Sequence, residues 1–205
     1  SRLDGRVTLT LPRGVPARAA VAFAEERAGW IRGHLAEIAA PERVALGSRL
    51  PVEGRSCTVV AAARSALRTQ SGEIAVSRRA RSVPAAVGGL LKTLARERLT
   101  AASDAYAARL GMVYARITLR DTRSRWGSCS DAGALMYSWR LVMAPPDVLD
   151  YVAAHEVAHL AVMDHSARYW EVVGRLCPDY EAPRRWLREH GQELHRWRFA
   201  GGVPD

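Results

Sequence analysis

The chain has 205 residues, of which 48% are hydrophobic and 25% charged, a balance typical of a soluble globular protein. No run approaches the ~18 apolar residues that a membrane-spanning helix needs, so no membrane partner is expected. The net charge is +9, and residues 1–100 carry all of the excess positive charge. This asymmetry makes nucleic acid a candidate partner through the basic N-terminal half.

The cysteines indicate a cellular compartment. Cys57, Cys129 and Cys177 are widely spaced, odd in number and form no C-x-x-C pair. This pattern predicts reduced, mostly buried thiols rather than a disulfide framework, and therefore a cytoplasmic protein.

Hydrophobic periodicity and turn residues predict helices and short strands in alternation. In chain order we expect a strand over residues 6–12, a helix over about 17–40, a small sheet of short strands over 48–77, a helix over about 85–110, a strand over 113–119, a loop over 120–131, a strand over 134–142, a helix opened by Pro146, a helix from Ser166 towards Pro178, and a last helix over 180–190. The basic connector at 78–84 suggests two domains, residues 1–82 and 83–205.

The helix opened by Pro146 carries the most informative motif, His155-Glu156-x-x-His159. Positions i and i+4 lie on one face of a helix, so both histidines can point at the same ion. Catalytic zinc takes three protein ligands and leaves a fourth position for water. Glu156 is placed to take a proton from that water. The motif therefore predicts a zinc-dependent hydrolase.

The third ligand has two candidates, His165 and a carboxylate further on such as Glu171. Asp164 and Ser166 flank His165, and both residue types favour helix ends. If the helix stops near residues 163–164 and turns back, the turn delivers His165 to the site. We favour His165, because imidazole suits zinc.

Four ordered motifs resemble a known family. Arg123-Ser-Arg-Trp-Gly-Ser-Cys129, Ser138-Trp-Arg-Leu141, His155-Glu-Val-Ala-His-Leu160 and His165-Ser-Ala-Arg-Tyr-Trp170 are similar, in order, to the YgjP-like metallopeptidase domain, a relative of the SprT and Wss-type metalloproteases. The resemblance covers nearly the whole chain.

The resemblance implies an α+β fold: a minimal zincin-like domain with an active-site helix packed on a small sheet, preceded by an N-terminal α/β region of short strands. It implies His155, His159 and His165 as ligands of one Zn²⁺ per chain, and Glu156 as general base of a peptidase. The chain departs from the family pattern at Ser138, where Asn is frequent, and at Tyr169, where Phe is usual.

Substrate binding and oxyanion stabilisation have several candidates: Arg125, Trp126, Tyr137 and Tyr169. Trp126 could instead plug the core, with Gly127 supplying a special backbone angle, and both tyrosines could serve packing alone. Cys129 is expected to be a plain buried thiol rather than a fourth ligand. The strand over 134–142 could pair with an extended peptide substrate.

Two other functions fit the sequence. A zinc hydrolase of a nucleotide phosphoanhydride would use the many arginines to bind an anionic substrate. A DNA-associated protease would dock through the basic N-terminal half. A non-catalytic, metal-stabilised binding module is disfavoured, because a structural site needs no glutamate between its histidines.

Overall fold

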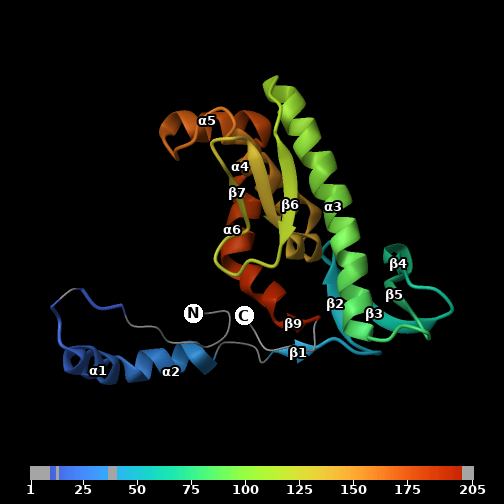
Figure 1. The fold of residues 1–205 in the computed structure, drawn as a ribbon, viewed down its shortest axis with the longest axis horizontal. Coiled ribbons are helices and arrows are strands. Elements are labelled where there is room, and N and C mark those ends of the chain that lie inside the picture. Colours follow the sequence, from blue (N-terminus) through green and yellow to red (C-terminus); the bar gives the residue numbers. More distant parts are fainter. Residues whose placement is uncertain (1–9, 13, 37–40, 200–205) are drawn as a thin grey trace. The chain divides into compact units, whose positions relative to one another are not determined.

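The computed structural model describes residues 10–12, 14–36 and 41–199. The chain forms two compact units, residues 1–41 and residues 42–205 (Figure 1). The predicted strand over residues 6–12 lies mostly outside the described residues. The suggested division into residues 1–82 and 83–205 stays a prediction.

The first unit contains two short helices, α1 (Ala17–Glu26) and α2 (Ala28–Ala36), where the sequence predicted one. The break is a single residue, Arg27, whose ψ of 6° departs from helical geometry. The Arg27 N–H still donates to the Phe23 carbonyl, and the Ile31 N–H donates to the Arg27 carbonyl. The prediction of one continuous helix was therefore wrong at Arg27, and its last part, residues 37–40, lies outside the described residues.

The second unit begins with the predicted small sheet. Its strands are β2 (Arg49–Val52), β3 (Arg55–Ala62), β4 (Ala66–Arg68) and β5 (Glu73–Ser77), in the order β2-β3-β5-β4. Strands β3 and β5 pair in parallel and the other pairs are antiparallel. The prediction for residues 48–77 is confirmed.

A second sheet lies next to the histidine motif. It consists of β6 (Arg116–Arg120), β7 (Gly127–Cys129) and β8 (Ala134–Ser138), in the order β6-β8-β7. Strand β8 is parallel to β6 and antiparallel to β7, so it is central, with β6 and β7 at the two edges. The predicted loop over 120–131 was wrong in that it missed β7.

The strand predicted over 134–142 ends at Ser138, because a 3₁₀ helix, η2 (Trp139–Met143), follows. All five side chains of η2 are buried. A strand would send alternate residues to opposite faces of the sheet, whereas η2 packs this run against the long helix beside it.

The helices of the second unit are α3 (Val83–Leu110), α4 (Pro146–Ala158), α5 (Ala167–Leu176) and α6 (Glu181–His190), followed by the 3₁₀ helix η3 (Gly191–His195). A short parallel pair, β1 (Glu42–Arg43) and β9 (Trp197–Arg198), joins the ends of this unit. Helix α3 is capped by Ser82, whose Oγ accepts the Ala85 N–H, and ends at Gly111 in the left-handed region. The α+β class is confirmed.

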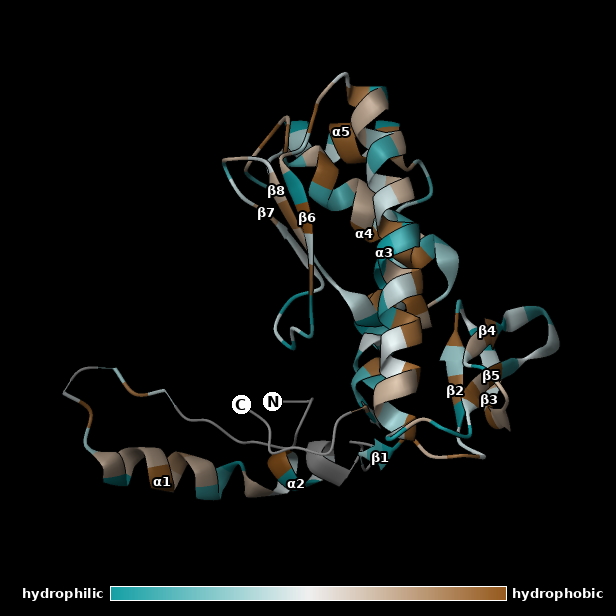
Figure 2. Cartoon of the chain, turned by 45° about the vertical axis from the view of Figure 1, so that its right-hand side comes forward, coloured by the Kyte–Doolittle hydropathy of each residue, from teal (hydrophilic) through white to brown (hydrophobic). Residues whose placement is uncertain are grey.

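The core forms where α3 meets α4 and η2. Helix α3 alternates between hydrophobic and hydrophilic bands along its length (Figure 2), as expected of a helix with one buried side. Among the described residues, no helix is both long and apolar enough to cross a bilayer.

One buried arginine ties three segments of this unit together. The Arg140 guanidinium donates to both carboxylate oxygens of Asp121, at 2.6 and 3.1 Å. It also donates to the carbonyls of Leu194 and Trp197, at 2.7 and 3.1 Å. Arg140 thus fixes the start of the loop between β6 and β7 to η2 and to the C-terminal segment.

We predict that Arg140→Met lowers the free energy of unfolding by about 3 kcal/mol, because the Asp121 carboxylate and two carbonyls lose their hydrogen-bond donor. Urea unfolding followed by circular dichroism measures this change. Arg116→Met is the control, because Arg116 is exposed and has no ion pair within the described chain; its effect should stay within about 0.5 kcal/mol. Equal midpoints for the two variants would contradict the role of Arg140.

Candidate metal centre

Helix α4 presents His155 and His159 on one face and buries most of its other residues. It begins at Pro146, as predicted, but it ends at Ala158 with His159 as the capping residue. The expected extension to residues 163–164 was wrong. The N–H groups of Leu160, Ala161 and Val162 instead close tight turns onto the carbonyls of Val157 and Ala158.

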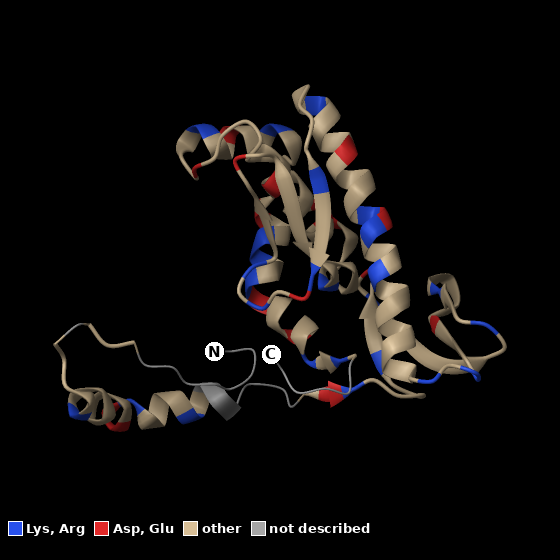
Figure 3. Cartoon of the chain, viewed as in Figure 1, with Lys and Arg blue, Asp and Glu red and all other residues tan. Residues whose placement is uncertain are grey.

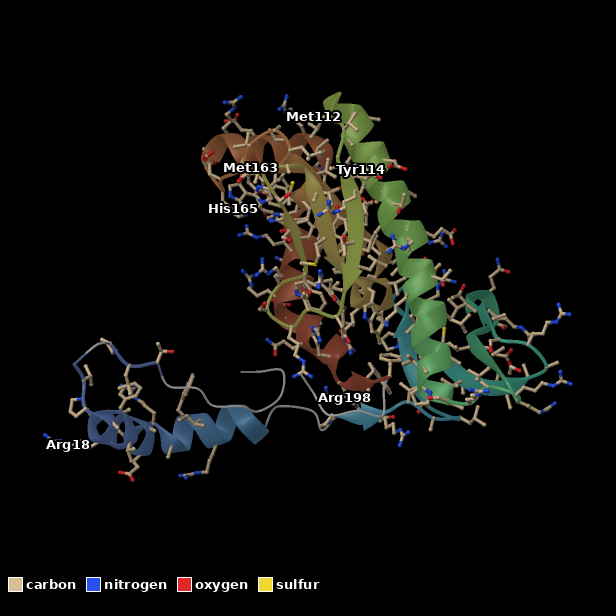
Figure 4. All side chains as sticks on the ribbon, in the orientation of Figure 1. Arg18, Met112, Tyr114, Met163, His165 and Arg198 are labelled. Atoms are coloured by element: carbon tan, nitrogen blue, oxygen red, sulfur yellow. The ribbon has the colours of Figure 1, made fainter. Side chains whose placement is uncertain are left out.

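This early turn brings His165 back to the helix. The Asp164 carboxylate accepts the Ser166 N–H at 2.9 Å, which shapes the backbone just before α5. Side chains of the turn and of the start of α5 gather on the same side of the domain, where Figure 4 labels His165 and Met163. The turn brings His165 next to His155 and His159, as the sequence predicted, although the turn starts sooner.

His155, His159 and His165 each offer a ring nitrogen within 4.8 Å of the others. The Nε2 atoms of His155 and His165 are 3.4 Å apart. Two nitrogens bound to one tetrahedral zinc at 2.0–2.1 Å would be separated by about 3.4 Å. The cluster therefore has the donor type that zinc prefers, and the pair His155 and His165 has the spacing of two ligands on one tetrahedral ion.

The protonation state of the rings also fits a cation. Burial, and then the neighbouring histidines, lower the pKa of His155 to about 3, and burial lowers the pKa of His159. Both rings are therefore neutral near pH 7 and can offer a lone pair. The His159 Nδ1–H donates to the Val162 carbonyl at 3.1 Å, which leaves Nε2 as its free donor atom. His155 Nδ1 is buried with no partner within the described chain.

The ring of Tyr169, on α5, packs against all three histidine rings. Its ring stacks on His159 with centroids 4.4 Å apart and meets His155 and His165 edge-on. Its hydroxyl donates to the His155 carbonyl at 2.9 Å. The hydroxyl by which this chain departs from the usual phenylalanine thus anchors the α4 backbone.

Glu156 is also buried, and it lies against the backbone of β7. A Cβ placed on Gly127 would be 2.6 Å from Glu156 Cγ and 2.8 Å from Cδ, so any larger residue there would require the Glu156 side chain to move. Gly127 has no positive φ, and the expectation of a special backbone angle was wrong. Burial raises the pKa of Glu156 to about 8, while the positive charge of Arg125 acts in the opposite direction.

The other predicted substrate residues lie in different settings. Arg125 is exposed, at the end of the loop next to Glu156. Trp126 packs on Gly191 and on the His195 ring, with centroids 5.1 Å apart, which favours the plugging role. Tyr137 is fully buried and its hydroxyl hydrogen-bonds to Ser103 at 3.0 Å.

Two alternative ligands lie outside the histidine cluster. Glu171 is exposed on α5. Among residues 10–12, 14–36 and 41–199 there is one group of three or more candidate ligands, and Glu171 does not belong to it. Cys129 is outside that group as well, and burial raises the pKa of its thiol to about 11, which disfavours the thiolate that a metal needs.

Three supporting residues were missed by the sequence reasoning: Gly127 as a contact of Glu156, Tyr169 as a platform, and Arg140 as an anchor. Each lies within a motif quoted above, but its partner is distant in the chain. Glycine inside a strand can mark a site of close approach, but the sequence placed Gly127 in a loop.

The sequence model of the family described as YgjP-like, metallopeptidase domain, matches residues 2–190. The chain belongs to this YgjP-like family. Its metallopeptidase description agrees with the three-histidine cluster and supports a metal-dependent peptidase. A search of curated proteins found no match to this YgjP-like chain.

We predict that the purified protein contains about one zinc ion per chain, and that His155→Ala and His165→Ala each lose it. Mass spectrometry of metal content tests this. His190→Ala is the control, since this exposed histidine bonds only Glu193 within the described chain and should leave the metal content unchanged. A folded wild type that takes up no metal, even after zinc addition, would contradict the assignment.

Proposed function

We propose that this protein is a zinc-dependent metallopeptidase in which His155, His159 and His165 hold one zinc ion and Glu156 is the general base. The observation that carries the proposal is the convergence of three imidazoles beside a buried carboxylate that follows the first of them in sequence. A zinc ion in such a site acts as a Lewis acid and lowers the pKa of a water molecule towards ~7.

Glu156 takes the proton from the attacking water and later delivers it to the leaving amine. Its carboxylate lies against Gly127, where any side chain at position 127 would displace it. Arg125 is the oxyanion or substrate contact that we retain, because it is exposed beside Glu156. The hydroxyls of Tyr137 and Tyr169 are already engaged with Ser103 and with the His155 carbonyl.

The substrate backbone needs a free strand edge, and the predicted partner strand does not offer one. Strand β8 has β6 on one side and β7 on the other. The Trp126 carbonyl and the Ser130 N–H form hydrogen bonds with β8. Alternate residues of an antiparallel strand point their backbone groups in the opposite direction, so those of Gly127 and Cys129 face the unpaired edge of the sheet. We therefore propose that an extended peptide pairs with β7, next to Glu156.

The reaction class is tested with a panel of fluorogenic peptides, casein and nucleoside triphosphates, with zinc-loaded protein. We expect hydrolysis of peptides or casein, abolished by removal of the metal with a chelator. Activity confined to the triphosphates would replace the peptidase proposal with hydrolysis of a nucleotide phosphoanhydride.

Glu156→Gln should bind zinc with unchanged stoichiometry and lose at least about 10²-fold in kcat, because the amide cannot accept the proton. Metal content and turnover are measured on the same preparation. Undiminished turnover in this variant would refute the role of Glu156 as general base.

Gly127→Ala should lower kcat by about 10²-fold while the zinc content stays the same, because the added methyl group displaces the Glu156 carboxylate. Gly89→Ala is the matched control. No atom lies within 4 Å of a Cβ at Gly89 on α3, so this variant should keep full activity and be slightly more stable. Equal activity of the two variants would show that the contact between Gly127 and Glu156 is unimportant.

A further inference from the structure

A cavity of about 370 Å³ lies between α3 and β6, at the opposite edge of the second sheet from Gly127 and β7. Lys92 and Arg96 contribute to it from α3, and Arg120 from the end of β6. It shares no residue with the histidine cluster. Figure 3 shows basic residues on both of these elements.

The three cations of this cavity have no carboxylate partner within the described chain. Lys92 and Arg96 are four residues apart and therefore lie on the same face of α3. The only acid in the cavity wall is Asp121, and its two oxygens are already bonded by Arg140. The cavity thus carries an excess of about three positive charges.

The other cations on α3 are bonded to groups of the protein itself. Arg98 is bonded to Glu53 at 2.7 Å and to Glu97 at 3.2 Å. Arg109 donates to the carbonyls of Leu176 and Arg175. Arg98 and Arg109 of α3 thus have partners within the protein, whereas Lys92 and Arg96 of the same helix have no carboxylate partner among the described residues.

One of the three cations lies against an aromatic ring. The Lys92 ammonium lies 5.7 Å from the centroid of the buried Trp139 ring, a cation–π distance. This contact reduces the freedom of the lysine side chain, so less entropy is lost when an anion binds. Arg96 and Arg120 add planar guanidinium groups, which match the oxygens of a phosphate.

We propose that Lys92, Arg96 and Arg120 form a binding site for a phosphate-bearing ligand, separate from the metal centre. A singly charged carboxylate would leave most of the positive charge uncompensated, whereas a polyphosphate or successive phosphodiesters would neutralise it. Two sources supply this chemistry: a free polyphosphate such as that of a nucleotide, and the backbone of a nucleic acid.

The test compares two triple variants of the zinc-loaded protein with the same change in charge. The first is Lys92→Gln with Arg96→Gln and Arg120→Gln. The second, the control, is Arg64→Gln with Arg78→Gln and Arg79→Gln, three exposed arginines that follow β3 and β5. Because the first set removes the contact between Lys92 and Trp139, Arg96→Gln with Arg120→Gln is a third variant that keeps it.

The probes are inorganic pyrophosphate, followed by calorimetry, and a fluorescein-labelled oligothymidylate, followed by anisotropy at ~50 mM salt. We expect the cavity variants to bind at least one probe about tenfold or more weakly than the wild type, and the control to bind like the wild type. For the oligonucleotide, the slope of log affinity against log salt should fall by about 2 in the triple cavity variant and by about 1.4 in the double variant, since each single-strand contact contributes about 0.7.

The pattern of binding identifies the source. Weakened pyrophosphate binding in the cavity variants assigns the site to a free polyphosphate, and weakened oligonucleotide binding that millimolar pyrophosphate does not compete assigns it to a nucleic acid backbone. Absence of binding by the wild type overturns the proposal. Equal binding by the cavity and control variants also overturns it, because the anion would then be bound elsewhere, for example at the metal. Neither result bears on peptide hydrolysis, which the substrate panel tests independently.

Discussion

The close contact between the Glu156 carboxylate and Gly127 is the constraint on which the arrangement of this site depends. It requires α4 and β7 to approach so closely that a Cβ at position 127 would collide with the Glu156 side chain. The approach is held by groups on either side of it: Trp126 packs on Gly191 and His195, and Arg140 bonds Asp121 at the start of the same loop. A carboxylate buried without a paired cation is costly, so this contact has to be stabilised by the rest of the fold.

The histidines are held by burial and by packing against Tyr169 rather than by a close backbone contact. Burial keeps the rings of His155 and His159 neutral, and Tyr169 fixes their relative orientation by stacking and through the His155 carbonyl. His165 differs in that it is exposed and comes from the turn rather than from the helix. The site is therefore rigid on the α4 side and open to solvent on the side of the turn, as a centre that exchanges substrate needs to be.

The sequence predicted the helices, the first sheet and the three histidines well, because each depends on local periodicity or on a motif within about ten residues. It failed where tertiary contacts decide. Strand β7 is three residues long and exists because it pairs with β8. Residues 139–143 have the composition of a strand, yet they form a 3₁₀ helix because every side chain is buried. The early end of α4 is set by the hydrogen bond of His159 with Val162 and by the turns around it, which periodicity cannot encode.

The loop from Asp121 to Trp126 joins the proposed phosphate site to the proposed catalytic site, yet the two are physically insulated. Its start is fixed by Arg140 and its end by the packing of Trp126. A phosphate bound by Lys92, Arg96 and Arg120 would not need to displace Asp121, because that carboxylate is already neutralised. Occupancy of the cavity therefore changes charge at the far edge of the sheet without releasing the loop. The geometry favours a site that binds its anion without switching the catalytic site.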